Sequence, residues 1–326
     1  MKFVRFGNWS TGVVVSGDRV LNLTAAVTSP SASRIPAAQI VRAFLSPDSV
    51  SWDAMIAGWP VVRPAVEELL DRAESGDPAL PVRDLAALHL LPPLSSPRAR
   101  MFAMAANFAD HLARAFSVIK GAPFTEEHVE QQVLADLPSG FMVIPGTVIG
   151  PGAEIVPPPG QVKLDYEVEA AVIVGSPTPD GRLNPWGYTA WNDISVRDTY
   201  FPSGPRIDAG PLVWALQKNW LTGNAAGPWV VVEDGIDVQD LSLRSFVNGE
   251  KRQDGSTAKM MYPFQSTYDL LAPYVGLGPG DVLVSGTPMG TALEEGEHGP
   301  YLRPGDVIEI EVGDAGTRLR NIVGDF

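Results

Sequence analysis

The apolar residues near the N-terminus come in short runs separated by turn residues, a pattern typical of strands. It predicts a small β meander over residues 2–6, 11–15 and 19–23. Between residues 33 and 77 the apolar positions recur every three or four residues, which indicates helices with one buried face. A proline-rich stretch, residues 91–97, follows and is typical of a linker. We therefore expect an N-terminal α+β domain over residues 1–95 and a second domain over 96–326.

The second region reads mostly as short strands joined by turns. The pair Asn248-Gly249 between two strand-like runs predicts a β-hairpin. Helical spacing follows His111 and recurs from about residue 258 to 274. Another helix is expected in the acidic segment 121–140, where Thr125 could cap its first turn. That segment could be a lid over a site or a plain surface helix.

One strand of the second region carries three acidic residues. Side chains alternate between faces along an extended strand, so Asp165, Glu167 and Glu169 share one face. Residues 171–174 are apolar on both faces, as in a strand that enters a core. Carboxylates grouped at the end of such a strand repel one another and are costly to bury unless a cation lies between them. A hard divalent cation fits these oxygen ligands, and Asp193 in the next segment could supply a third.

A solvated edge strand with an acidic face is the alternative interpretation. For an isolated pair of acidic residues two positions apart, it is the more common one. The apolar continuation of this strand and the second acidic segment favour the cation site instead.

Composition and charge exclude several classes of function. The chain has 326 residues, 45% hydrophobic and 19% charged, as in a soluble globular protein. Its formal net charge of -14 argues against a nucleic acid or an anionic membrane as a partner, because both need clustered basic residues. The absence of cysteine excludes disulfides, thiolate catalysis and cysteine-bound zinc. The N-terminus has no apolar leader and no run of about 18 apolar residues occurs, so we expect a cytoplasmic protein.

Further residues could belong to a site, although each also has a plain structural interpretation. His111 opens a helix, where a neutral imidazole could act on a water molecule. Lys218 lies among apolar and neutral residues that could hold its ammonium group near a negative substrate, or it is a surface lysine. Gly286-Thr287 could present a hydroxyl and backbone N–H groups to a small anion, or form an ordinary turn. The acidic stretch 294–299 is typical of a solvated loop.

Taken together, ordered segments of the chain resemble the fumarylacetoacetate hydrolase family. The resemblance runs from about Met101 to Phe326, and it is specific because the segments occur in the family's order. They are Asn107-Phe108-Ala109-Asp110-His111, Asp165-Tyr166-Glu167-Val168-Glu169, the run from Gly187 to Asp198, Lys218, Gly227-Pro228, Asn248-Gly249-Glu250 and Gly286-Thr287-Pro288-Met289-Gly290. Sequence markers of serine hydrolases, Rossmann dehydrogenases and zincins are absent.

The resemblance implies an α+β, mainly β fold. Its C-terminal domain would be a mixed β-sandwich or β-roll beside a smaller N-terminal domain, in a homodimer. It also implies a divalent metal, Mg2+ or Mn2+ with Ca2+ as an alternative, held by Glu167, Glu169 and Asp193. The expected substrate is a small 1,3-dicarbonyl or 2-oxo acid such as an acylpyruvate, whose two oxygens would chelate the metal.

The same resemblance implies catalytic roles for three residues. His111 would activate water for attack on a carbonyl and so split a C–C bond. Lys218 would stabilise the developing negative charge, and Arg197 would position the substrate or support Asp193. We therefore expect a metal-dependent hydrolase. The alternatives are a decarboxylase, tautomerase, isomerase or dehydratase that uses the same metal and enolate, and a binding protein that keeps the pocket without turnover.

The substrate side of the site departs from the family's pattern. Thr287 and Gly286 are expected to bind the substrate carboxylate. Tyr200 stands where relatives often carry glutamine, and Ile144 where they carry lysine. These replacements predict a more apolar site for a bulkier, less charged substrate.

The partner of the predicted base also differs. Many family hydrolases pair the histidine with a glutamate three residues later, where this chain has Arg114. Arginine cannot accept a proton, and a cation beside His111 would lower its basicity. The sequence offers, as replacements for the missing carboxylate, Glu126, Glu127 and Glu130.

Overall fold

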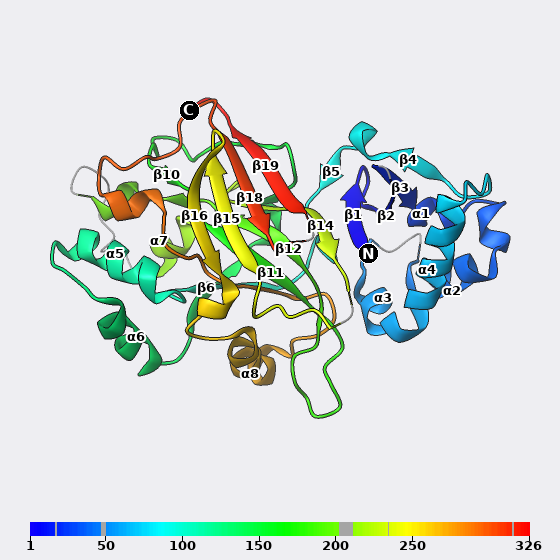
Figure 1. Cartoon of the computed structure of the whole chain (residues 1–326), viewed down its shortest axis with the longest axis horizontal. Helices are drawn as coiled ribbons and strands as arrows, with labels where there is room; N and C mark the ends of the chain where they lie inside the picture. The colour runs from blue at the N-terminus through cyan, green and yellow to red at the C-terminus, as the bar shows by residue number, and fades with distance from the viewer. Residues whose placement is uncertain (17, 47–49, 202–210, 234, 315) are drawn as a thin grey trace.

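The computed structural model describes residues 1–326 apart from 17, 47–49, 202–210, 234 and 315. The N-terminal part opens with the predicted meander, β1 (Lys2–Phe6), β2 (Ser10–Val15) and β3 (Arg19–Asn22). The helical spacing after it corresponds to α2 (Pro36–Phe44), α3 (Asp53–Ala57) and α4 (Trp59–Glu74). Three short elements complete this part, namely α1 (Leu23–Ala26), β4 (Val82–Asp84) and β5 (Leu90–Leu91) (Figure 1).

The N-terminal meander continues into a sheet of the second part. β1 pairs antiparallel with β14 (Asn224–Val231), which sets Phe3 opposite Val230. The joined sheet has the order β4-β3-β2-β1-β14-β12-β11-β17-β6-β7, with β5 beside β1 and β8 beside β14. Its other strands are β12 (Pro185–Asp193), β11 (Val168–Val174), β17 (Val282–Val284), β6 (Met101–Ala105), β7 (Ser139–Val143) and β8 (Val148–Ile149). The domain boundary after residue 95 stays a prediction, and strands from both sides of it share this sheet.

A second sheet of five strands packs on the first. Its order is β16 (Glu250–Ser256), β15 (Ser242–Val247), β18 (Val307–Val312), β19 (Thr317–Val323) and β9 (Glu154–Ile155). The predicted hairpin joins β15 to β16, because Asn248 and Gly249 adopt positive φ angles of 52° and 82° that suit a tight two-residue turn. β10 (Leu164–Asp165) and β13 (Ser195–Val196) form a separate pair.

Strand β11 is buried on both faces, as its apolar pattern predicts. Ala170 and Val172 face a core shared with Leu243 and Ile310 of the five-stranded sheet. Ala171 and Ile173 alternate with these residues and belong to a second core, on the opposite face. The two sheets and their cores confirm the α+β fold with a β-sandwich.

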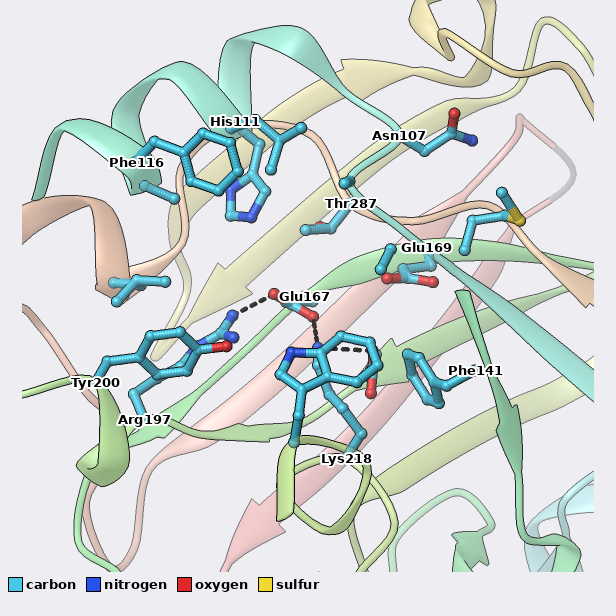
Figure 2. A pocket seen from close by; sticks show the side chains of 18 of the residues that line it. Asn107, His111, Phe116, Phe141, Glu167, Glu169, Arg197, Tyr200, Lys218 and Thr287 are labelled. Atoms are coloured by element: carbon cyan, nitrogen blue, oxygen red, sulfur yellow. Dashed lines mark hydrogen bonds and ion pairs between the residues drawn. The ribbon is translucent and has the colours of Figure 1, made fainter. Parts of the chain in front are cut away.

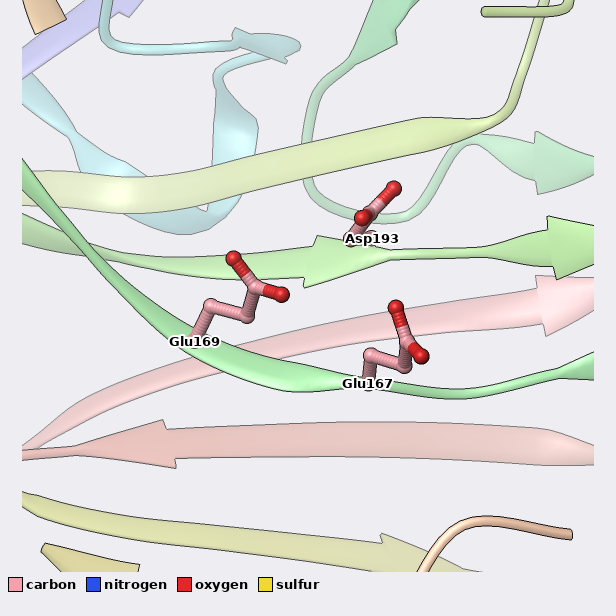
Figure 3. Close-up of side chains that lie close together, drawn as sticks. All are labelled: Glu167, Glu169 and Asp193. Atoms are coloured by element: carbon pink, nitrogen blue, oxygen red, sulfur yellow. The ribbon is translucent and has the colours of Figure 1, made fainter. Parts of the chain in front are cut away.

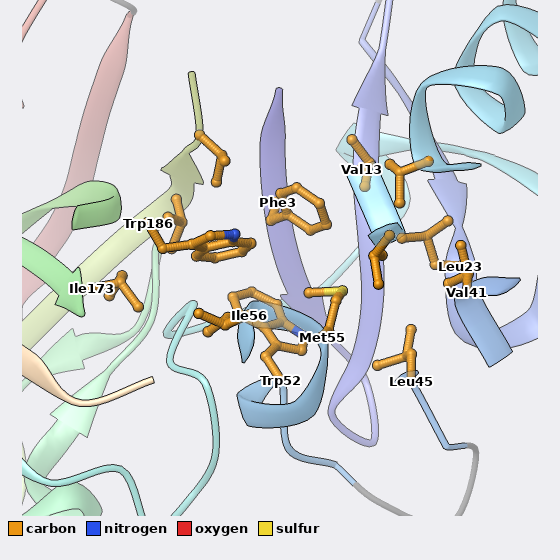
Figure 4. Packing of buried hydrophobic residues seen from close by; sticks show 14 of the residues in the cluster. Phe3, Val13, Leu23, Val41, Leu45, Trp52, Met55, Ile56, Ile173 and Trp186 are labelled. Atoms are coloured by element: carbon orange, nitrogen blue, oxygen red, sulfur yellow. The ribbon is translucent and has the colours of Figure 1, made fainter. Parts of the chain in front are cut away.

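The second core joins the N-terminal helices to the large sheet. Phe3 lies with its ring centroid 5.1 Å from that of Trp186 and 6.0 Å from that of Trp52. Trp59 lies edge-on to Trp186, with centroids 5.4 Å apart. Figure 4 shows Phe3, Trp52 and Trp186 close together in this core, with Ile173 beyond Trp186.

The second part also contains α-helices outside its sheets (Figure 1). They are α5 (Ala109–Lys120), α6 (Glu126–Leu134), α7 (Pro211–Leu216) and α8 (Phe264–Val275). Thr125 caps α6 as predicted, accepting the His128 N–H at 3.2 Å. The helix also has a packing face, because Val129 is fully buried against α5. Among the described residues, every helix is too short or too polar to span a membrane.

Helix α8 begins later than the spacing predicted. Residues 257–259 form a 3₁₀ turn, and Pro263 precedes the first residue of the helix. Proline cannot donate an N–H to a helical ladder, so the helix starts after it.

Candidate active site

Three carboxylates come together where β11 and β12 lie side by side. Glu167 precedes β11, Glu169 is the second residue of β11, and Asp193 is the last residue of β12. The backbone N–H of Asp193 donates to the carbonyl of Glu167 at 3.1 Å, which fixes the two strand ends together. One oxygen of each side chain lies within 4.8 Å of the others, and all three residues are buried (Figure 3). The structure thus brings the three predicted metal ligands into one cluster.

Two buried cations lie against this cluster. Lys218 donates from Nζ to Asp193 Oδ2 at 2.7 Å and also to Glu167 Oε2. Arg197 donates from Nη2 to Glu167 Oε1 and from Nε to Asp165 Oδ2 at 3.0 Å. Figure 2 shows Glu167 held between the two cations. Arg197 therefore contacts Glu167 and Asp165, and not Asp193.

Burial and neighbouring charges separate the acidities of the three carboxyl groups. Burial favours the neutral form of Glu167, but the charges of Arg197 and Lys218 outweigh it and hold its pKa below the usual value. At Glu169, burial and then the charge of Asp193 raise the pKa well above the usual value. Burial also raises the pKa of Asp193 to about 6, against the opposing charge of Lys218. Without a further cation, Glu169 and Asp193 therefore hold protons more readily than ordinary carboxyl groups.

The residues present fit a divalent cation. Asp193 Oδ1 is buried and accepts no hydrogen bond from any described residue, so a ligand position is open there. Four buried carboxylates, counting Asp165, face only the two cations Arg197 and Lys218 in this cluster. Full ionisation would leave two unbalanced negative charges, which one divalent ion would balance. Carboxylate oxygens are also the ligands that Mg2+ and Mn2+ prefer.

Asp165 is not one of the three predicted metal ligands, but it borders them through Arg197 and anchors the surrounding chain. Its oxygens accept the backbone N–H groups of Ala292 at 2.7 Å and Leu293 at 3.1 Å. These groups open the 3₁₀-helix Ala292–Glu295, whose unpaired N–H groups favour a negative charge. Asp165 therefore fixes both this helix and the guanidinium of Arg197.

His111 has a carboxylate partner that the sequence interpretation missed. Its Nδ1 lies 2.7 Å from Glu294 Oε1, and the two side chains are 12% and 3% exposed. The hypothesis that Glu126, Glu127 or Glu130 takes this role is wrong, because all three are exposed on α6. Arg114 is exposed as well and pairs with no described carboxylate, so it does not displace the Glu294 partner.

Glu294 was also misread as part of a solvated loop. It forms a capping box with Thr291, in which the glutamate side chain accepts backbone N–H groups at the start of the 3₁₀-helix. It further accepts the Gly290 N–H at 3.0 Å. The Thr-Xaa-Xaa-Glu spacing is the sequence signal that predicts such a cap, and it was present at 291–294.

The Gly286-Thr287 loop contacts the carboxylate cluster at Glu169. The Gly286 N–H donates to Glu169 Oε2 at 3.0 Å. The φ of Gly286 is +78°, a backbone conformation that favours glycine. A Cβ atom added at this position would also lie only 3.1 Å from the Cβ of Asn107, so there is room for glycine alone. Thr287 donates its hydroxyl proton to the Val168 carbonyl at 2.9 Å and accepts from Gln253 Nε2 at 2.8 Å. The hydroxyl is therefore already engaged, and substrate binding by this loop stays a prediction.

A cavity of about 170 Å3 connects these groups. Every predicted site residue lines this cavity except Gly286, whose backbone N–H donates to Glu169 instead. His111 enters it from α5 and Tyr200 from the opposite side, as Figure 2 shows. The cavity thus places a carboxylate-paired histidine opposite a cluster fit for a metal ion. The catalytic and binding roles of these residues stay predictions.

Residues 100–323 match the family model described as the fumarylacetoacetate (FAA) hydrolase C-terminal domain. The match covers more than half of the chain. The chain belongs to the fumarylacetoacetate hydrolase family. The family predicted from the ordered motifs is thereby confirmed.

Similar proteins of the family include hydrolases and a tautomerase. The 2,4-didehydro-3-deoxy-L-rhamnonate hydrolase of a Sphingomonas species is 31% identical over 191 residues, 57% of this chain and 65% of that protein. The human mitochondrial oxaloacetate tautomerase is 26% identical over 250 residues, 75% of this chain and 72% of that protein. A maleylpyruvate hydrolase from a Sphingobium species, solved with manganese(II) and pyruvate, matches with a TM-score of 0.65 and 21% identity over 100% of this chain and 99% of that one. These relatives support an enzyme, and the last one supports the fold.

Proposed function

We propose that the protein is a divalent-metal-dependent hydrolase that cleaves a C–C bond in a 1,3-dicarbonyl compound of the acylpyruvate type. The observation that carries the proposal is the shared cavity, which the carboxylate cluster and His111 both line while Glu294 holds the imidazole through Nδ1. Hydrolysis needs both a polarised carbonyl and an activated water molecule. This cavity supplies residues for each.

Glu167, Glu169 and Asp193 would hold the ion, with Mg2+ or Mn2+ the expected metal. When bound, the ion would polarise the substrate oxygens and stabilise enolate charge. The maleylpyruvate hydrolase of the same fold was solved with manganese(II) and pyruvate, which supports this choice. Lys218 adds positive charge on the same side of the cavity through its contacts with Glu167 and Asp193.

His111 would act as the base. Its Nδ1 is paired with Glu294, so Nε2 is the nitrogen left to take a proton from water. The resulting hydroxide adds to the distal carbonyl carbon, and the C–C bond to the central carbon breaks. The electron pair of that bond remains on the 2-oxo acid fragment as an enolate. Protonation of its carbon, by the proton held on His111, gives a carboxylic acid and a 2-oxo acid.

A tautomerase or isomerase is the second candidate, because the human relative is an oxaloacetate tautomerase. Such chemistry needs the metal cluster and a base but no attack by water. The carboxylate partner of His111 favours the hydrolase, since an imidazole oriented by a carboxylate is the usual device for activating water.

Product analysis tests the proposal. Acylpyruvates would be incubated with the protein and Mg2+ or Mn2+, and the products identified by mass spectrometry. We expect two fragments, and we expect them to vanish in Glu169→Gln and in His111→Gln. An isomer or CO2 without fragments would contradict hydrolysis and support the second candidate.

We also propose a homodimer that uses the edge strand β7. β7 ends the large sheet, and the Asn219 side chain ties it to α7, because it accepts the Ile144 N–H and donates to the carbonyls of Met142 and of Ala215 in α7. Large apolar side chains are exposed around this edge, among them Met142, Ile144, Leu212 and Leu216. Light scattering after size exclusion should give twice the chain mass, and a monomer would contradict the dimer. A cytoplasmic location stays a prediction from the sequence.

A further inference from the structure

One face of helix α5 forms an apolar wall of the active-site cavity. Leu112, Ala115, Phe116 and Ile119 all line it, and their spacing of three and four residues places them on one side of the helix. At about 1.5 Å per residue, the wall extends about 12 Å from His111 to Ile119. Figure 2 shows Phe116 farther along α5 than His111. The wall therefore extends along α5 beyond the base.

Two aromatic rings add to the lining of the same cavity. Phe141 of β7 and Trp214 of α7 both line it, and they meet edge to face with centroids 5.3 Å apart. The indole and phenyl rings hold each other in place in this geometry. The apolar face of α5 and this ring pair thus both contribute apolar side chains to the lining, and Phe141 lies on the side of Glu169 and Lys218 (Figure 2).

The positive charges of the cavity are already engaged. Among the described residues that line it, only Arg197 and Lys218 carry a fixed positive charge. Both are already paired with carboxylates of the metal cluster. A second carboxylate on the far end of a substrate would therefore lose its water without gaining a cation among these residues.

We propose that the natural substrate carries an uncharged apolar tail, an aryl or branched alkyl group, that lies between α5 and the Phe141–Trp214 pair. The inference rests on the proposed function for the other end of the molecule, a 2-oxo acid bound at the carboxylate cluster. It deepens that function by naming what the acyl side carries. Ile119, at the far end of the wall, is the residue that the tail reaches last.

Binding of three stable 2-oxo acids tests the proposal without turnover. 2-Oxobutyrate has a short tail, 2-oxo-4-phenylbutyrate a phenyl tail and 2-oxoglutarate a carboxylate tail, so they share the head and differ at the far end. Calorimetric titration of the Mg2+-loaded protein would rank them. We expect the phenyl compound to bind about tenfold or more tighter than 2-oxobutyrate, because it buries a ring. 2-Oxoglutarate should bind no tighter than 2-oxobutyrate.

A charge placed in the wall should reverse this ranking. Ile119→Lys is expected to weaken the phenyl compound by about tenfold and to strengthen 2-oxoglutarate by a similar factor. Val118→Lys is the matched control. Val118 is the neighbouring residue and packs, like Ile119, against the core between the two sheets, but it does not line the cavity. The control variant should leave the ranking unchanged.

Equal binding of the three acids, tighter binding of 2-oxoglutarate to the wild type, or binding of none of them would overturn the proposal. The wild-type ranking decides the matter even if Ile119→Lys does not fold. Absence of fragments from every acylpyruvate, with the phenyl preference intact, would count against the hydrolase and not against the apolar tail. The two proposals can therefore fail separately.

Discussion

The protein buries positive charge in two regions, and it surrounds that charge differently in each. In the N-terminal part, Arg5 is fully buried and donates to the carbonyls of Trp9, Val50, Leu94 and Ser95 and to the Thr11 hydroxyl. Its guanidinium also lies 4.1 Å from the ring centroid of Trp52. In the active site, Arg197 and Lys218 donate to carboxylates.

This difference indicates a structural role for Arg5 and a chemical role for Arg197 and Lys218. All the hydrogen-bond acceptors of Arg5 are neutral, and they belong to segments far apart in the sequence, so the guanidinium ties β1 to the linker with each of its N–H donors engaged. Around Arg197 and Lys218 the carboxylates outnumber the cations, and Asp193 keeps an oxygen without a partner among the described residues. A cation whose hydrogen-bond donors all have acceptors is held rigidly and offers no position to a ligand. A centre with excess charge and an open ligand position can take an ion.

Removal of one metal ligand should have the largest effect on activity. Asp193→Asn takes away the open oxygen ligand and one of the negative charges, so we expect Mg2+ affinity and turnover to fall by about 10³-fold. Calorimetry and steady-state kinetics would measure the two. Asp254→Asn, at an exposed surface pair, is the control and should behave as the wild type. Unchanged metal affinity in Asp193→Asn would show that the cluster is not the metal site.

Removal of the buried guanidinium should act on stability alone. Arg5→Met leaves its carbonyl partners without donors, so the free energy of unfolding should fall by about 3 kcal/mol or more. Denaturant unfolding measures it, and Arg98→Met at an exposed position should change it by less than about 0.5 kcal/mol. The folded fraction of Arg5→Met should still bind Mg2+ with wild-type affinity. A loss of metal affinity there would mean that the two centres are coupled.

Replacement of the histidine partner should have a smaller catalytic effect. Glu294→Gln keeps the shape of the side chain but removes the charge that orients His111, so we expect kcat to fall by about 10- to 100-fold with little change in KM. Glu295→Gln alters the adjacent exposed glutamate and is the control. An unchanged kcat in Glu294→Gln would assign Glu294 to capping of its helix only.

The last prediction concerns how the affinity for Mg2+ changes with pH. Burial raises the pKa of Glu169 and of Asp193, the latter to about 6, in the protein without an added ion. Protons must leave these carboxyl groups before a cation binds, so Mg2+ affinity should rise with pH by about tenfold per unit for each proton displaced, and level off at higher pH. Titrations between pH 5 and 8 would show it. An affinity that does not change over this range would contradict the raised pKa values.

Sequence reasoning performed well where the signal was local. The alternation of 165–169 and the apolar run after it located the carboxylates, and Asn248-Gly249 located a hairpin. Thr125 was found as the cap of α6. It failed for α8, which starts after Pro263 rather than at residue 258. The segment 294–299 was misread because a capping glutamate and a solvated one have the same composition.

The sequence by itself determined which groups could bind a metal and that the chain carries the ordered motifs of its family. Spacing along one strand fixes which side chains share a face, and that information is local. Only the tertiary structure decided that Glu294 pairs with His111, that Arg5 ties β1 to the linker, and that α5 and the Phe141–Trp214 pair line the same cavity as the carboxylates. These contacts join residues far apart in the chain, and the periodicity of either segment alone carries no information about its partner. Packing of the two sheets brings them together.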